Sequence, residues 1–218
     1  MRRLVPLARM IALLGSWCEG ELRSGNPLSG AIRVYWHQWP ARGRQELLRL
    51  ARGESAAWAL PVTATEEDRL LATAAAGGGK RSGLVLVYAH EKPQADWLVA
   101  ACRLRGYTAV HVTSAAAAQG TVPIFAPAKM GLSPLTVGME GAVAVIFDGG
   151  EFGQREADEL CSLAAAMPPA PIVALLEFPR IEDYRRALAC GARAILSKPL
   201  LVDDLFWQLD ELVGYASA

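Results

Sequence analysis

The residues best placed for chemistry are charged side chains that directly follow short apolar segments in the last two thirds of the chain. Asp148 follows AVAVIF, Lys198 follows AILS, and a third apolar segment, LVLV, ends at Val87. Parallel strands bring their carboxyl ends to one edge of a sheet, and open α/β sheets bind ligands there. We therefore expect these strand ends to lie together, with Asp148 and Lys198 close enough to form an ion pair.

Other arrangements that could support catalysis are missing from the sequence. The glycine-rich stretch before Lys80 is not a phosphate-binding loop, because Ala74 and Arg81 stand where such a loop needs Gly and then Ser or Thr. The three histidines and four cysteines lack metal-ligand spacing, and no nucleophile is paired with a base. We expect no enzymatic activity and no metal site.

The cysteines are scattered, without a CxxC motif. This pattern favours reduced core thiols in a cytoplasmic protein over disulfides or metal ligands. The residues concerned are Cys18, Cys102, Cys161 and Cys190.

Composition and charge describe a globular protein of 218 residues, 52% apolar and 20% charged. The formal net charge is zero, so no bulk field favours direct binding of nucleic acid or of an anionic membrane. The apolar amino terminus resembles a short signal peptide, but Arg9 interrupts it and Trp17 precedes Cys18. We expect a buried strand or helix there, with no membrane span.

Apolar segments alternate with helical ones after residue 83. Continuous apolar runs are typical of strands buried on both faces of a parallel sheet, and Gly106 fits a helix C-cap. With too little chain for antiparallel hairpins, the order predicts an α/β fold: an open parallel five-stranded sheet with helices on both faces. The expected strands are 84–87, 108–112, 142–147, 172–176 and 194–197, and the expected helices are 94–105, 156–166, 181–190 and 202–213.

Residues 82–214 resemble the receiver domains of response regulators, the CheY-like family. The resemblance rests on Gly106-Tyr107, on Asp148, on Gly191-Ala192 and, most specifically, on Ser197-Lys198-Pro199. It implies the CheY-like (flavodoxin-like) fold. It also implies that Asp148 takes the place of the phosphoacceptor and Lys198 that of the lysine that contacts the phosphoryl group.

The chain departs from this family where Mg²⁺ and phosphate would be bound. The acidic metal pair falls on Ala89 and His90, with only Glu91 nearby, and neither Ala nor neutral His is a natural Mg²⁺ ligand. The hydroxyl position falls on Leu176 and the aromatic switch position on Ile195. The domain is therefore expected to be a pseudo-receiver without a cofactor, and Mg²⁺ would be needed only if Asp148 is phosphorylatable.

A glycine-rich linker over residues 76–82 is expected to separate an amino-terminal α/β segment, 1–75, from the pseudo-receiver domain, 83–218. The first segment aligns weakly with the end of the second when Gly53 is placed on Gly191. One reading is a partial receiver-like unit, and the alternative is a helical or mixed arm. In this alignment 4–10 falls on the third strand with Met10 in the place of Asp148, 32–36 falls on the fourth strand, and 51–62 tracks 189–200.

Two regions are candidates for contact with other proteins. On the last helix Trp207 lies opposite the apolar stripe, and with Tyr184 and Arg185 of the preceding helix it forms the expected interface for a protein partner or for self-association. The proline-interrupted stretch 119–134 is longer than a compact receiver needs and cannot be a regular helix. It is either a docking loop or, as we favour, packs within the chain.

These features favour a non-catalytic signalling or regulatory protein that acts through phosphorylation-independent protein contacts. Some atypical receivers regulate transcription, but those carry an RNA-binding tail, and this chain stops shortly after its last helix. The alternative is a phosphorylatable response regulator that accepts a phosphoryl group at Asp148 from a histidine kinase. A small-molecule sensor that uses the pocket left by the metal is a more distant alternative.

Overall fold

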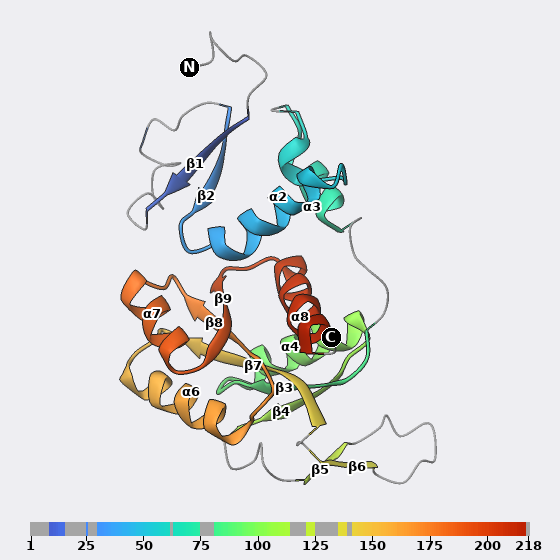
Figure 1. Cartoon of the computed structure of the whole chain (residues 1–218), viewed down its shortest axis with the longest axis vertical. Helices are drawn as coiled ribbons and strands as arrows, with labels where there is room; N and C mark the ends of the chain where they lie inside the picture. The colour runs from blue at the N-terminus through green and yellow to red at the C-terminus, as the bar shows by residue number, and fades with distance from the viewer. Residues whose placement is uncertain are drawn as a thin grey trace. The chain divides into compact units, whose positions relative to one another are not determined.

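The computed structural model describes residues 9–15, 25, 30–61, 63–74, 81–113, 121–124, 135–138 and 141–216. The chain divides into two compact units, Met1–Gly78 and Gly79–Ala218 (Figure 1). Most of the expected linker, 76–82, lies outside the described residues. No helix in the described part of the chain is both long and apolar enough to cross a bilayer.

Unit 2, Gly79–Ala218, is built on a five-stranded parallel sheet in the order β4-β3-β7-β8-β9. This is the flavodoxin-like order of a doubly wound sheet, in which the strand order reverses between β3 and β7. The predicted fold class is confirmed. The strands are β3 (Leu84–Tyr88), β4 (Thr108–Val112), β7 (Ala142–Gly150), β8 (Ile172–Glu177) and β9 (Ala192–Lys198).

Helices cover both faces of this sheet (Figure 1). On one face α4 packs beside α8, and on the other α6 packs beside α7. Gly106 ends α4 with φ +108°, in the left-handed region that glycine adopts without strain, as predicted for a C-cap. The helices are α4 (Lys92–Arg105), α6 (Gln154–Ala166), α7 (Ile181–Ala189) and α8 (Val202–Ala216).

The core of unit 2 follows from the period-2 geometry of its strands. Every residue of β3 is buried, because alternate side chains point to opposite faces and helices cover both. Leu86 and Phe147 belong to the cluster that includes Leu160 and Leu163 of α6. The sheet is thus held as a rigid platform whose carboxyl edge carries the candidate site.

The stretch between β4 and β7 contains an antiparallel pair that the sequence analysis excluded. β5 (Thr121–Ile124) pairs with β6 (Leu135–Gly138), and Pro123 lies within β5. Because this pair forms a sheet of its own, Pro123 interrupts no ladder of the five-stranded sheet. The remainder of the predicted 119–134 insertion lies outside the described residues.

Unit 1, Met1–Gly78, has a parallel two-stranded sheet of β1 (Met10–Leu14) and β2 (Ala31–Tyr35). The alignment that placed Met10 at the carboxyl end of a strand was wrong, because Met10 begins β1. The segment expected to match β9 is also not a strand. It contains the short helix η3 (Ala57–Ala59). Further helices among the described residues of this unit are η2 (Trp39–Gly43), α2 (Arg44–Ala51) and α3 (Glu66–Ala74).

A side-chain contact explains why η3 replaces a strand. The buried carboxylate of Glu46 on α2 accepts a hydrogen bond from the backbone N–H of Trp58, at 3.0 Å. The Trp58 ring is buried and stacks on Trp39, with ring centroids 5.8 Å apart. This helical turn therefore brings an aromatic side chain into the small core of unit 1.

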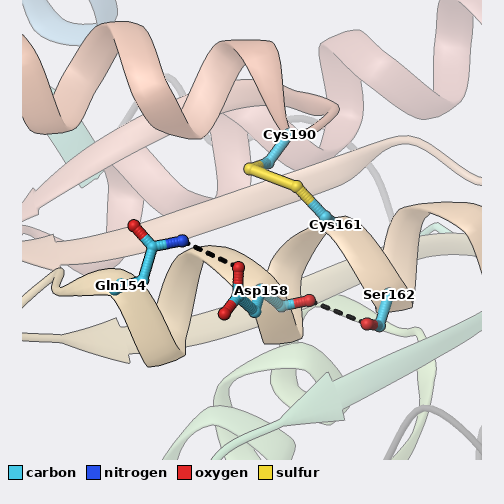
Figure 2. Close-up of a disulfide and its surroundings, with 5 residues drawn as sticks. All are labelled: Gln154, Asp158, Cys161, Ser162 and Cys190. Atoms are coloured by element: carbon cyan, nitrogen blue, oxygen red, sulfur yellow. Dashed lines mark hydrogen bonds between the residues drawn. A yellow bond between two sulfur atoms is a disulfide. The ribbon is translucent and has the colours of Figure 1, made fainter.

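The expectation of reduced cysteines was wrong for two of the four. Cys161 of α6 and Cys190, the C-cap of α7, form a disulfide (Figure 2). They are 29 residues apart in sequence, but the neighbouring helices bring their Cα atoms to 4.5 Å, within the normal range for a disulfide. Cys102 is a free buried thiol as expected, and burial raises its pKa to about 12. Cys18 lies outside the described residues.

Candidate functional site

The carboxyl edge of the sheet brings Asp148 and Lys198 together, as predicted. Lys198 Nζ forms an ion pair with Asp148 Oδ1. Strand β8 lies between β7 and β9, so roughly 10 Å of sheet separates the two backbones, and the long lysine side chain crosses it. Both side chains are largely buried, 17% exposed for Lys198 and 8% for Asp148.

A second carboxylate, which was not predicted from the sequence, belongs to this group. Glu177 ends β8 directly opposite Lys198, and its Oε1 lies 3.5 Å from Lys198 Nζ. Glu177 is half exposed, so its contribution to the pairing is screened by solvent. Like Asp148 and Lys198, Glu177 is a charged residue that directly follows an apolar strand segment, so its place at the sheet edge could have been predicted from the sequence.

A β-bulge sets the direction of Asp148. The register between β7 and β8 shifts after Asp148, which leaves Gly149 as an extra residue. A Cβ on Gly149 would lie 2.8 Å from the Phe147 ring and 2.9 Å from the Leu176 side chain, so only glycine fits here. The bulge therefore turns the strand end over an apolar floor.

The two predicted metal positions follow β3 and hold no carboxylate. Ala89 is buried, and its carbonyl oxygen lies 2.8 Å from His111 Nε2. His90 turns towards α6, where its Nε2 lies 2.7 Å from Glu159 Oε2. Glu91 is the exposed N-cap of α4, and its carbonyl accepts the Ala95 N–H.

Glu159 gathers several groups at this corner of the sheet. Its Oε1 accepts a hydrogen bond from Arg155 Nε at 3.1 Å, in addition to the contact with His90. Burial raises the pKa of Glu159, but the hydrogen bonds from His90, Arg155 and Tyr88 lower it more, so the net pKa is below its ordinary value. Burial and the nearby Glu159 carboxylate in turn raise the pKa of Tyr88 to about 12.

The positions that carry the hydroxyl and aromatic residues in receivers are part of the core here. Leu176 and Ile195 are buried, and both belong to the cluster beneath α6. Ser197 is a buried hydroxyl beside the site, but it donates its hydrogen bond to the Lys198 carbonyl at 3.3 Å. No hydroxyl from the Leu176 position therefore faces Asp148.

The donor set does not fit a magnesium ion. Mg²⁺ requires hard oxygen ligands, usually carboxylates and waters in octahedral geometry. Ala89 offers a methyl group, the His90 imidazole is engaged by Glu159, and Asp148 is paired with Lys198. Within the described ranges no three His, Cys, Asp or Glu side chains gather in a way that could hold a metal.

The predicted interface residues lie on two different helices. Tyr184 of α7 packs partly against the core, and burial raises the pKa of its hydroxyl. Arg185, the next residue, is exposed. Trp207 of α8 is half-buried and has contacts of its own. These helices flank β9, the edge strand of the sheet.

Comparison with known proteins gives similarity at the level of structure. No protein-family model matches the chain, and no curated protein is similar to it in sequence. Similar solved structures include the receiver domain of the Francisella response regulator 1452, with 16% identity and a TM-score of 0.46 over 62% of this chain and 98% of that chain.

Two further solved structures are similar to the chain at a comparable level. A CheY-like receiver domain protein from Methanospirillum hungatei has 14% identity and a TM-score of 0.48, over 63% of this chain and 98% of that one. NtrX from Brucella abortus, in complex with ADP, has 18% identity and a TM-score of 0.46, over 63% of this chain but only 28% of NtrX. At these identities the similarity is one of fold.

Proposed function

We propose that the chain is a non-catalytic signalling or regulatory protein of the cytoplasm. Its second unit keeps the receiver scaffold and acts through phosphorylation-independent contacts with other proteins. The observation that carries this proposal is the identity of the side chains at the carboxyl edge of the sheet. Ala89 and His90 stand where two carboxylates would bind a metal in a phosphorylatable receiver.

Phosphoryl transfer to an aspartate places negative charge on the transferred group and on the acceptor. A metal ion is the usual electrostatic partner for that charge, and preorganised donors supply the rest. Here one cation, Lys198, is shared between Asp148 and Glu177. The simplest role of this group is structural, joining the ends of β7, β8 and β9.

The alternative is that Asp148 still accepts a phosphoryl group from a histidine kinase. The contact between Asp148 and Lys198 favours this alternative, because both residues expected of a receiver lie at one edge. It requires a makeshift metal ligand, for which Glu91 is the nearest carboxylate in sequence. A phosphodonor assay separates the two functions.

The surface proposed for contact is the one made by α7, β9 and α8, which carries Tyr184, Arg185 and Trp207. Apolar side chains that project from the same region support it. Ile181 and Leu188 of α7 are 41% and 43% exposed, and Phe178, just before the helix, is 53% exposed. Phe178 also adopts φ +40°, a strained conformation for a residue with a side chain. Exposed apolar groups beside an arginine are typical of protein-binding surfaces.

Self-association of the full chain tests this surface directly. Leu188→Ser and Trp207→Ala should weaken association in sedimentation velocity experiments over a concentration series. Leu104→Ser is the matched control, because Leu104 is 78% exposed on α4. Circular dichroism should confirm that each variant is folded. Equal association of Leu188→Ser, Leu104→Ser and wild type, or a wild-type chain that remains monomeric, would contradict self-association through this surface.

A further inference from the structure

The disulfide between α6 and α7 lies at a solvent-accessible position. Cys161 is exposed in the middle of α6, and Cys190 is partly buried at the end of α7 (Figure 2). Asp158, one turn before Cys161, accepts a hydrogen bond from Gln154 Nε2 at 2.9 Å. The disulfide is therefore part of the outer surface of unit 2, where a thiol reagent can reach it.

The disulfide contributes more to holding α7 on the sheet than to holding its neighbour α6. Of the residues of α7, only Ala187 is buried, and it is a small side chain. Helix α6 on the same face buries Ala157, Leu160 and Leu163. Burial of apolar area is the main force that holds a helix on a sheet. Because α7 adds only the partly packed Tyr184 to the buried Ala187, packing holds α7 less firmly than α6.

The bond also fixes the turn that leads into β9. Cys190 directly precedes Gly191, which has φ +105° and whose Cβ position lies 2.8 Å from the Ala164 side chain on α6. The disulfide thus joins α6 to the end of α7 next to a close approach of the backbone to α6. Strand β9, which follows, carries Lys198.

We propose that the Cys161–Cys190 disulfide is a reversible redox clamp on α7, broken by a dithiol reductant. This proposal rests on the proposed function, both for the cytoplasmic location and for α7 as part of the contact surface. Disulfides of cytoplasmic proteins are usually transient and sense redox conditions, because thiol systems keep most cysteines reduced. In the reduced protein α7 is released, and the surface around Arg185 and Leu188 changes.

The dithiol reductant supplies the electrons and protons for the thiol–disulfide exchange. A thiolate of the dithiol attacks the exposed Cys161 sulfur, and Cys190 leaves as a thiolate that takes up a proton. The second thiol of the reductant then attacks the mixed disulfide, which releases Cys161 as a thiol. The protein gains two electrons and two protons, and the dithiol becomes its own disulfide.

Hydrogen exchange of the full-length protein, with and without dithiothreitol, tests the clamp without any partner. Reduction should lower the protection of the α7 amides by at least about tenfold and leave those of α4 unchanged. Re-oxidation with glutathione disulfide should restore the protection. The Cys161→Ser/Cys190→Ser variant should match the reduced protein and show no response to dithiothreitol.

Three results would overturn the proposal. These are unchanged α7 exchange after reduction, failure of the bond to form again, and alkylation of Cys161 and Cys190 in protein prepared without reductant. Cys102 serves as an internal reference, because it is buried and should remain unlabelled while the protein is folded. Failure of the proposed function would appear separately, as self-association that is insensitive to Leu188→Ser while the α7 exchange still responds.

Discussion

At the scale of single residues, the candidate site is decided by three neighbouring side chains at the sheet edge. Lys198 lies between Asp148, which is largely buried, and Glu177, which is half exposed. A buried carboxylate is costly unless a cation or hydrogen-bond donors satisfy it. Among the described residues, Asp148 also accepts a hydrogen bond from the Gly150 N–H at 3.4 Å, so Lys198 is its main partner.

Removal of the Lys198 charge should therefore destabilise the protein. Lys198→Met leaves Asp148 buried without its cation and should lower the free energy of unfolding by about 2–3 kcal/mol. Lys92→Met is the matched control, because Lys92 pairs with Asp96 on the solvent-exposed surface, where the two side chains are 78% and 62% exposed. The control should change stability by about 0.5 kcal/mol or less. Equal effects in urea unfolding would show that Asp148 and Lys198 are not coupled.

The network around Glu159 should make stability depend on pH. Its pKa in the folded state lies below the ordinary value, so its stabilising contribution is present at neutral pH and is lost as the pH falls through the folded pKa. Glu159→Gln should cost about 1 kcal/mol at pH 7, discounted for partial exposure, and the difference from wild type should shrink on acidification.

Urea unfolding of both proteins across the acid range measures this difference. Glu151→Gln, at an exposed carboxylate, is the control and should follow wild type at every pH. A difference between Glu159→Gln and wild type that persists unchanged below the ordinary carboxyl pKa would contradict the role assigned to Glu159. Tyr88 and His90, which share the site, are unchanged in both variants.

At the scale of elements, α8 is fixed to the start of unit 2 by Asp210. Its carboxylate forms an ion pair with Arg105 at the end of α4 and lies 3.3 Å from Arg81 Nε. Tyr107 before β4 donates its hydroxyl to Asp210 Oδ1 at 3.0 Å. Burial and the nearby Asp210 raise the pKa of Tyr107. Three segments thus converge on one side chain that is 11% exposed.

Asp210→Ala should accordingly be one of the most destabilising polar substitutions in unit 2. It leaves two arginines and a buried hydroxyl without their shared partner and should cost about 3 kcal/mol. Tyr107→Phe should cost about 1 kcal/mol, and the double variant should cost less than the sum. Asp203→Asn, in the first turn of the same helix, should cost about 0.5 kcal/mol. Additive costs in the double variant would exclude the coupling.

Much of the sheet could be predicted from the sequence, because its strands are continuous apolar runs with clear ends. β4 has the predicted bounds, while β7 extends past the predicted end to include Asp148. The local signal failed in the stretch after β4, where prolines suggested an irregular loop and the structure has the β5–β6 pair. Antiparallel pairing of β5 with β6 depends on how the chain turns between the two strands, and the amino-acid composition of the stretch does not show such a turn.

Contacts distant in sequence explain what could not be predicted at the site. Glu159 lies 69 residues from His90, and Cys190 lies 29 residues from Cys161. Neither distance carries a pattern, since each contact exists only because α6 lies beside a strand end or beside α7. The Asp148–Lys198 pair could be predicted because both residues end strands of one parallel sheet.

At the scale of the whole molecule, the two units differ in how complete they are. Residues 79–218 contain the five-stranded sheet with helices on both faces. Within residues 1–78, the part that the structure describes has a two-stranded sheet and a small core around Val34, Ala57 and Trp58. A two-stranded sheet with little core is rarely stable alone, whereas an α/β unit whose sheet is covered by helices on both faces can fold independently.

A fragment of residues 79–218 should therefore unfold cooperatively in urea with an α/β circular dichroism spectrum. A fragment of residues 1–78 should show no cooperative transition. Both are compared with the full chain under the same conditions. A 79–218 fragment without a cooperative transition would show that the boundary between the units is misplaced.

We propose that unit 2 works without phosphorylation of Asp148. Intact-mass spectrometry after incubation with acetyl phosphate and Mg²⁺ tests it most directly, with Asp148→Asn as the control and an ordinary receiver domain as the positive reference. No phosphoryl adduct is expected on the wild-type chain under conditions that label the reference. An adduct on the wild type that is absent from Asp148→Asn would contradict the account and establish a working phosphoacceptor.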